Sequence, residues 1–315
     1  MKKPKKTKSK PCLAKYQNFN LSSGFFGFRE KITILCKVIG ITFKKRKIVK
    51  NITIVFLLLA ITLLSSSSQI KKTDFKVKTV VIDAGHGGHD PGTHGSSTKE
   101  KDLVLKVALK LGSYIEEYLP DVKVIYTRDD DTFVTLKGRA EIANKNKADV
   151  FISIHANSLP ESVSTTRKNQ IRGTETYVMG AQNTGRNLEV AKRENSVILL
   201  EEDYEKTYDF DPNSPESYIL FSLTQSAFQE KSIYLATQIE NQFKTRAGRH
   251  SLGVKQSSLY VLWSTAMPSV LVEIGYLSNS TEEEQLNNSS VQGNIASGIF
   301  RAFRDYKNEI ESLNK

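Results

Sequence analysis

The stretch that decides the fold is Val80–Gly95, VVIDAGHGGHDPGTHG. It starts as an apolar run of strand-forming residues and stops in a loop with several glycines, three histidines and an aspartate. A buried strand that ends in such a loop can hold a phosphate, hold a metal ion, or simply turn the chain into a helix. Residues elsewhere in the chain decide between these alternatives.

Charge is distributed unevenly along the chain. Residues 1–50 contain 15 Lys and Arg and a single acid, Glu30, whereas the other 265 residues contain 30 basic and 33 acidic side chains. A nucleic-acid footprint should lie on the folded domain itself. Because the overall charge of +11 comes from residues 1–50, we interpret this segment as a basic N-terminal extension and exclude nucleic acid as a partner.

A hydrophobic segment follows the basic extension. Residues 52–64, ITIVFLLLAITLL, are apolar or weakly polar and precede a serine run. This length is short for a membrane span and fits the core of a signal peptide, with a buried core helix as the alternative. We expect residues 51–70 to be a signal or anchor segment with a Ser-rich linker. The protein is then exported to the periplasm or cell envelope, with membrane association through residues 51–64 if the segment stays attached.

From residue 76 on, apolar runs alternate with helical patterns. We expect strands at 77–85, 121–128, 149–157, 173–180 and 268–279, and helices at 100–119, 135–148 and 291–308. This alternation predicts a single α/β domain with a mostly parallel, twisted sheet flanked by helices. The expected domain covers residues 76–307, and residues 308–315 form a tail.

The alternation stops between residues 181 and 232. The stretch is too long for a connection between two elements, and NLEVAKRENSVILLEEDYEKTYDF within it has a helical, highly charged pattern. We therefore expect a mainly helical insertion that lies on the surface near the ligand site.

Polar side chains lie where the expected strands end. His86 and His155 follow or close two strands, Glu273 lies in a third, and Glu100 lies in the first turn of a helix. Because the carboxyl ends of parallel strands meet at one edge of a sheet, these side chains can converge. Two imidazoles and a carboxylate are a common ligand set for catalytic zinc, and a second carboxylate can serve as general base. The loop has neither GxGxxG nor GxxxxGK[ST], which disfavours a phosphate site.

The two carboxylates differ in how strongly they indicate a functional site. Glu100 alone is explained by the preference for acids at helix N-termini. Glu273 lies in the apolar run LVEIGY, where a carboxylate is costly without a metal-bound water or a basic side chain nearby. Cys12 and Cys36 both precede the hydrophobic segment, so any metal in the exported part is held by His and carboxylate.

Six motifs resemble, in order, those of the zinc-dependent N-acetylmuramoyl-L-alanine amidases of the amidase-3 family. They are VVIDAGHGGHDPGTHG, KEKDLVL, SIHAN, GTETYVMG, GVKQSSLYVL and MPSVLVEIGYLSN. The resemblance spans residues 77–306 and implies one zinc ion held by His86, Glu100 and His155, with Glu273 as the catalytic residue. It also implies cleavage of the amide between N-acetylmuramic acid and the L-alanine of the stem peptide in peptidoglycan, in cell-wall remodelling or daughter-cell separation.

Two further histidines and two arginines near these motifs are not expected to take part in the chemistry. His89 and His94 are assigned no role at the metal. Arg128 and Arg139 are expected to form structural ion pairs rather than to hold substrate carboxylates.

The resemblance also suggests a role for the insertion. Some amidases of this family carry a helical insertion that covers the active site until a partner moves it. We hypothesise that residues 181–232 gate the zinc by placing an acid such as Glu194, Glu201 or Glu202 near it, and that an activator protein acts on them. A substrate-positioning wall or a docking surface is the alternative.

Two other functions are left open by the sequence. One is a zinc exopeptidase acting on other peptides. The other is a catalytically inactive wall-binding or regulatory protein, which would be expected to have lost Glu100 or Glu273; this chain keeps both.

Overall fold

A computed structural model of the chain describes residues 75–180, 185–223 and 227–313. The expected basic extension (1–50) and the expected signal or anchor segment (51–70) lie outside the described residues. Within the described ranges, no helix combines the length and the apolar character needed to cross a membrane.

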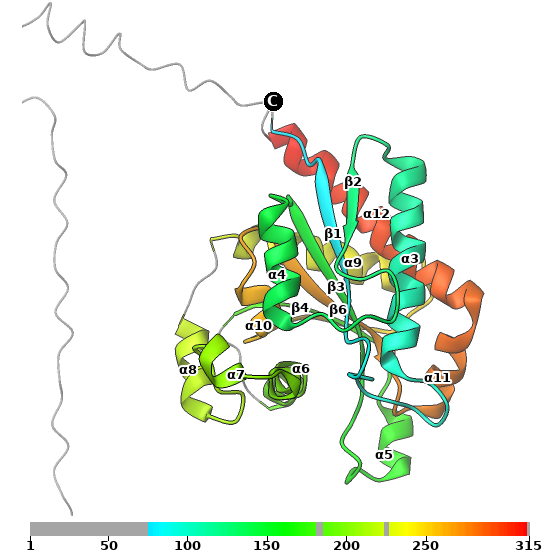
Figure 1. Cartoon of the computed structure of the whole chain (residues 1–315). Helices are drawn as coiled ribbons and strands as arrows, with labels where there is room; N and C mark the ends of the chain where they lie inside the picture. Colours follow the sequence, from blue (N-terminus) through cyan, green and yellow to red (C-terminus); the bar gives the residue numbers. More distant parts are fainter. Residues whose placement is uncertain (1–74, 181–184, 224–226, 314–315) are drawn as a thin grey trace, which may run out of the picture. The chain divides into compact units, whose positions relative to one another are not determined.

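Six strands form one sheet, in the order β2-β1-β3-β6-β4-β5 (Figure 1). They are β1 (Thr79–Ala84), β2 (Lys123–Tyr126), β3 (Val150–Asn157), β4 (Thr174–Met179), β5 (Ser251–Ser257) and β6 (Ser269–Tyr276). Neighbouring strands are parallel except β4 and β6, which are antiparallel. The predicted α/β fold with a mostly parallel sheet is confirmed.

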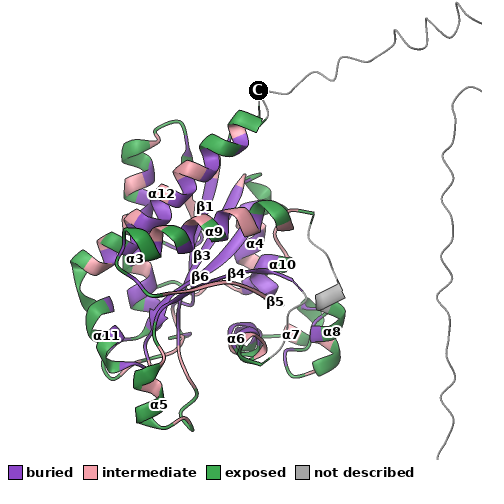
Figure 2. Ribbon diagram, turned by 180° about the vertical axis from the view of Figure 1, so that it is seen from behind, coloured by how far each residue is buried: buried purple, intermediate pink, exposed green. Residues whose placement is uncertain are grey.

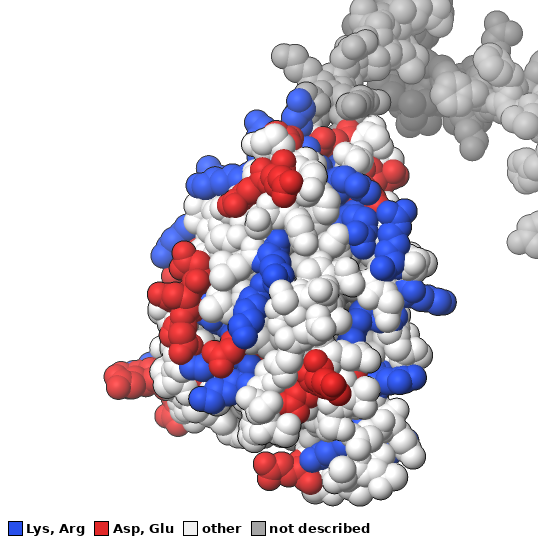
Figure 3. Space-filling view, turned by 90° about the vertical axis from the view of Figure 1, so that its right-hand side faces the viewer, with Lys and Arg blue, Asp and Glu red and all other residues white. Residues whose placement is uncertain are grey.

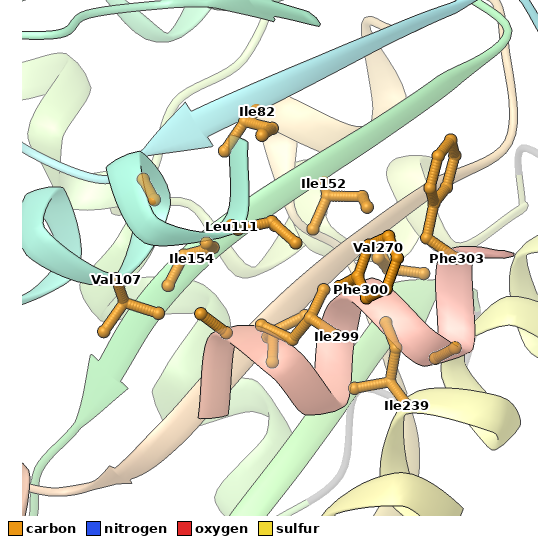
Figure 4. Close-up of a cluster of buried hydrophobic side chains, with 14 of the residues drawn as sticks. Ile82, Val107, Leu111, Ile152, Ile154, Ile239, Val270, Ile299, Phe300 and Phe303 are labelled. Atoms are coloured by element: carbon orange, nitrogen blue, oxygen red, sulfur yellow. The ribbon is translucent and has the colours of Figure 1, made fainter. Parts of the chain in front are cut away.

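Three long helices cover one face of the sheet: α3 (Glu100–Tyr118), α9 (Gln229–Thr245) and α12 (Ser289–Leu313). In α3 the apolar residues Leu103, Val107 and Leu111 recur at helical spacing and are buried, as expected for a helix with one apolar stripe. Figure 4 shows Val107 and Leu111 beside Ile82, Ile152 and Ile154 of the strands, with side chains of α9 and α12 packed against Val270 of β6.

The opposite face is covered by α4 (Leu136–Lys145), α10 (Tyr260–Trp263) and part of the expected insertion. The described part of the insertion contains α6 (Arg186–Asn195), the 3-10 helix η1 (Ser196–Leu200), α7 (Tyr204–Thr207) and α8 (Pro215–Leu223). Its buried apolar side chains are Val190, Ala191, Val197, Ile198, Tyr208, Phe210 and Tyr218. Buried positions on α6 are visible in Figure 2. The insertion is helical as expected, but it is an integral layer of this face and not only a surface feature.

The structure also shifts two expected boundaries. Helix α9 begins at Gln229, and Ser232 accepts a hydrogen bond from the backbone N–H of Ser269 at 3.0 Å, so residues 229–232 belong with the sheet and not with the insertion. Helix α12 continues to Leu313, past the expected end at residue 307, and its Glu311 accepts a hydrogen bond from the N–H of Val77 at 3.0 Å, so these last residues belong to the domain.

Two further helices of the described residues follow β3 and β6. They are α5 (Thr165–Gln170) and α11 (Ser280–Asn287). On the face seen in Figure 3, basic and acidic side chains are interspersed, in keeping with the nearly balanced charge of the chain after residue 50.

Candidate metal centre

The glycines of the loop after β1 make room for the imidazole rings. A Cβ atom on Gly85 would lie 2.4 Å from the ring of His155, and one on Gly92 would lie 2.5 Å from Cδ2 of His86. Distances below 3 Å leave no space for a side chain, so both positions require glycine. His86 itself has a φ of 60°, a conformation that a non-glycine residue adopts only where its surroundings hold it there.

Three of the expected site residues lie in one buried cluster: His86 from the loop, Glu100 from the start of α3 and His155 from β3. Nε2 of His86 and Nδ1 of His155 each lie 3.1 Å from Oε1 of Glu100. The fourth member is Glu194 of α6, whose Oε2 lies 2.9 Å from Nδ1 of His155 and 3.5 Å from Nε2 of His86. These four ligand atoms lie within 4.8 Å of one another, and all four residues are buried.

Neighbouring groups hold the cluster in place. Asp90, which the sequence interpretation did not select, contacts Nδ1 of His86 with Oδ2 at 2.7 Å. Glu100 accepts hydrogen bonds from the backbone N–H groups of Ala156 and Thr93, both at 2.8 Å. A carboxylate on the outer nitrogen of a histidine fixes its tautomer and leaves the other nitrogen free to bind a metal. The spacing of Asp90 four residues after His86 was the signal available in the sequence.

The donor atoms of the cluster fit a metal ion. Although both atoms lie close to other members of the cluster, Nε2 of His86 and Oε2 of Glu194 make no properly directed hydrogen bond, which proteins rarely tolerate for buried polar atoms. Burial opposes the charged imidazolium, but the charge of Glu100 and the hydrogen bonds to Asp90, Glu100 and Glu194 together outweigh burial and raise the pKa of His86 well above its usual value. Carboxylates that stabilise positive charge between two imidazoles can equally stabilise a divalent cation.

Glu273 lies beside the cluster on β6. It is paired in register with His155 of β3 and is fully buried. Burial raises its pKa well above the ordinary value, although the charge of Arg193 opposes this. Arg193 Nη2 lies 3.2 Å from Oε1 of Glu273. The sequence predicted either a metal-bound water or a basic side chain near this carboxylate, and the structure shows a basic side chain there. Oε2 of Glu273 has no hydrogen-bond partner.

Helix α6 supplies two site residues in addition to the predicted four, Arg193 and Glu194. Arg193 contacts Oε1 of its neighbour Glu194 at 2.8 Å while it also contacts Glu273. The expectation that an acid of the insertion approaches the metal-type cluster holds for Glu194. It does not hold for Glu201, which accepts hydrogen bonds from the Tyr208 hydroxyl at 2.7 Å and from the N–H of Leu136, at the start of α4, at 3.3 Å. Nor does it hold for the exposed Glu202.

The other residues considered from the sequence, two histidines and two arginines, are not members of the cluster. His89 packs against the ring of Phe133 at 4.0 Å, and neither it nor His94 belongs to the cluster. Arg139 forms the expected structural ion pair, with Asp83 at 2.7 Å. The expectation of an ion pair was wrong for Arg128, whose guanidinium donates to backbone carbonyls, including those of Ala84 and Gly85. Its role is structural nonetheless, because it fixes the loop that carries His86.

A cavity of about 1020 Å³ opens beside the cluster. Its lining includes His86, Asn157, Lys168, Arg186, Arg193 and Glu283. The cavity is large enough for a ligand of several residues. Fold and site together define an α/β protein whose buried histidine–carboxylate centre, at the carboxyl edge of the sheet, is of the kind found in metal-dependent hydrolases.

The comparisons give the family. The family model for N-acetylmuramoyl-L-alanine amidase, amidase-3, matches residues 80–305, and the chain therefore belongs to this family. N-acetylmuramoyl-L-alanine amidase AmiA of Escherichia coli is 32% identical over 244 residues, covering 76% of this chain and 80% of AmiA. A putative N-acetylmuramoyl-L-alanine amidase of Buchnera aphidicola is 29% identical, covering 72% of this chain and 94% of its own length.

Solved structures agree in fold. An N-acetylmuramoyl-L-alanine amidase from Clostridium difficile 630 is similar with a TM-score of 0.54 and 27% identity, covering 74% of this chain and 98% of that one. The CwlD amidase from Clostridioides difficile, solved in complex with the GerS lipoprotein, has a TM-score of 0.52 and 26% identity, covering 73% of this chain and 98% of that one.

Proposed function

We propose that this protein is a zinc-dependent N-acetylmuramoyl-L-alanine amidase that hydrolyses the amide between N-acetylmuramic acid and L-alanine in peptidoglycan. Membership of the amidase family supports the substrate. The observation that carries the chemistry is the buried group of His86, Glu100 and His155, with Glu273 on the adjoining strand.

The proposed zinc ligands are His86, Glu100 and His155. Two imidazole nitrogens and a carboxylate oxygen match the ligand types of catalytic zinc sites, which leave one position for water or substrate. A zinc ion bound there supplies Lewis acidity, which polarises the amide carbonyl and lowers the pKa of water. Asp90 orients the His86 ring, and the N–H groups of Ala156 and Thr93 orient the Glu100 carboxylate.

Glu273 is the proposed general base and acid. Its raised pKa makes it a better proton acceptor than an ordinary carboxylate, which is what a general base requires. Glu273 takes a proton from the attacking water and passes it to the departing alanine nitrogen. The free Oε2 atom is the one available for this transfer, since Oε1 is held by Arg193.

We further propose that the insertion, expected at residues 181–232, gates this site. Glu194 takes the place next to the two histidines where water or substrate must bind, and Arg193 holds the base. Ile219 and Leu220 of α8 are 60% and 67% exposed, and an apolar surface of this kind suits an activator protein. The similar CwlD amidase was solved in complex with the GerS lipoprotein, which supports the proposal that a partner protein acts on this amidase.

Peptidoglycan lies outside the cytoplasmic membrane, so this function requires export. Residues 51–70 are the proposed export or anchor segment, and the proposed catalytic domain, expected at residues 76–307, extends to the end of α12 at Leu313.

One assay tests the function against its alternatives. The full chain is incubated with peptidoglycan, with zinc or with a chelator, after replacement of Glu194 by Ala to release the site. A zinc-dependent product with free N-terminal L-alanine and an intact glycan is expected. Release of residues only from the ends of peptides would indicate an exopeptidase, and no cleavage under any condition would indicate an inactive wall-binding or regulatory protein.

A further inference from the structure

Glu175 of β4 is a second fully buried glutamate beside Glu273. In the antiparallel pairing of β4 with β6, Glu175 lies directly opposite Glu273, and His155 lies opposite Glu273 on the other side. Residues directly opposite each other on neighbouring strands point to the same face of the sheet. His155, Glu273 and Glu175 therefore form one row across three strands.

The two carboxylate oxygens of Glu175 have different partners. Oε2 accepts hydrogen bonds from Asn157 Nδ2 at 3.1 Å, from the Tyr177 hydroxyl at 3.0 Å and from the Tyr276 hydroxyl at 3.1 Å. Oε1 pairs with the Arg186 guanidinium. Three neutral donors saturate Oε2 and fix the side chain, so Oε1 is the atom that receives a cation.

The cation at Oε1 comes from the same helix that covers Glu273. Arg186 and Arg193 are seven residues apart in α6, which places them on one face of the helix, two turns apart. Arg186 pairs with Glu175, and Arg193 pairs with Glu273. Both arginines line the cavity. Helix α6 thus places one guanidinium on each of two neighbouring buried carboxylates.

Movement of α6 away from the site, as the proposed gating requires, removes both cations. Oε1 of Glu175 then faces the cavity without a donor, and an unpaired buried carboxylate is costly. A ligand group that carries positive charge or N–H donors relieves this cost when it takes the place of Arg186.

The proposed reaction forms such a group. Water adds to the amide carbon, the C–N bond breaks, and the protons released from water and the new acid go to the nitrogen. The products are a lactyl carboxylate and an alanine ammonium group. Because Glu273 delivers the proton, the ammonium group forms next to the carboxylate that follows Glu273 in the row.

We propose that Glu175 is a positioning residue that binds the alanine nitrogen of the leaving stem peptide through Oε1, and that Arg186 occupies this place in the closed arrangement. The inference rests on the proposed amidase function. In this proposal Glu175 binds a primary ammonium group when α6 has moved away, and it holds α6 through Arg186 when α6 is in place.

The test compares two peptides on a released full-length enzyme. In this variant Arg186, Arg193 and Glu194 are all replaced by Ala, which removes the three α6 side chains that contact the site. Dissociation constants are measured by calorimetry for a stem peptide with a free N-terminal L-alanine and for the same peptide N-acetylated. We expect the free amine to bind roughly tenfold more tightly, as a charge-assisted hydrogen bond allows.

Two further variants of the released enzyme test which carboxylate causes the preference for the free amine. Added Glu175→Gln should abolish the preference for the free amine. Added Glu240→Gln is the matched control, because Glu240 is a buried carboxylate that accepts hydrogen bonds from Thr174 and Thr176 of the same strand, on the opposite face of the sheet. It should leave the preference intact.

The outcomes separate this inference from the amidase proposal. Equal binding of the two peptides, or a preference that survives Glu175→Gln, overturns the role of Glu175 while peptidoglycan turnover can persist. If Glu175→Gln does not fold, Glu175→Asp, which keeps the charge but withdraws it by one methylene, must weaken the preference. Absence of peptidoglycan turnover in the released enzyme itself contradicts the amidase proposal instead.

Discussion

The two faces of the sheet are built on different principles. The face under α3, α9 and α12 is packed mainly with aliphatic and aromatic side chains, and its buried carboxylate, Glu240, accepts hydrogen bonds from neutral threonine hydroxyl groups. The face under α4, α6 and α10 combines an apolar cluster with the buried charges of Asp83, Glu175 and Glu273. Apolar burial stabilises a fold, whereas a buried charge is costly unless it is paired. The difference indicates that one face secures the structure and the other carries the chemistry.

Glu273→Ala tests the chemical face most strongly. Loss of a general acid and base should lower kcat by about 10²–10⁴-fold, while the metal stays bound because His86, Glu100 and His155 are intact. Turnover of peptidoglycan and zinc content per chain are the two measurements. Full activity of this variant would show that the assigned mechanism is wrong.

Phe303→Ala tests the structural face. Phe303 is completely buried between α12 and the sheet, and removal of a buried phenyl ring should lower the free energy of unfolding by about 3–5 kcal/mol. The kcat of the remaining folded enzyme should hardly change. Denaturant unfolding and kinetics at low temperature measure the two effects, and a large loss of kcat in folded protein would contradict the division between the faces.

Glu194→Ala tests whether the insertion blocks the site. Because the contact of Glu194 with the histidines is a buried, charge-assisted one, its loss should raise basal turnover roughly ten- to a hundredfold. Glu205→Ala is the control, since Glu205 is an exposed acid on α7 of the same insertion. Unchanged or reduced turnover for Glu194→Ala would favour a substrate-positioning wall over a gate.

Glu283 offers the smallest and most specific effect. Its carboxylate accepts hydrogen bonds from the N–H groups of Ser96, Ser97 and Thr98, at 2.8–3.0 Å, and so anchors the loop between His86 and Glu100. Burial alone would raise its pKa, but these hydrogen bonds lower it to about 2 from an ordinary value of 4.5. A depressed pKa stabilises the fold above pH 4.5, and this contribution is lost as the pH falls toward 2.

The corresponding prediction concerns Glu283→Gln. Unfolding at pH 6 should cost about 1–2 kcal/mol less than in the wild type, and the difference should shrink between pH 4.5 and pH 2. Thermal unfolding over this range measures it, with the exposed neighbour Glu284 changed to Gln as control. A difference that does not depend on pH would rule out the charge as its cause.

The parts of the fold that the sequence predicts are those with strong local patterns. β1, β3 and β6 are continuous apolar runs, and α3 has a clear apolar stripe. β5 was not predicted, because Ser251–Ser257 is a half-buried strand at the edge of the sheet and its pattern is weak. The burial of the insertion was also missed, since a charged helix such as α6 hides its few apolar residues among polar ones.

The site shows the same limit. His86, Glu100 and His155 converge because parallel strands end at one edge, a rule that needs no coordinates. Asp90, Glu175 and Arg186 depend on a loop conformation, on the register of an antiparallel pair and on the path of the insertion. None of these follows from the residue types alone.

The seven-residue spacing of Arg186 and Arg193 fixes the distance and the direction at which α6 presents its two arginine side chains. Its two arginines start about 10.5 Å apart along the helix axis and reach carboxylates on strands that lie about 4.8 Å apart, so the long side chains must converge. One added residue between them would rotate one guanidinium by about 100° and release one carboxylate while the other stayed covered. Insertions or deletions in this helix should therefore change the enzyme in steps set by the helical repeat, not in proportion to their length.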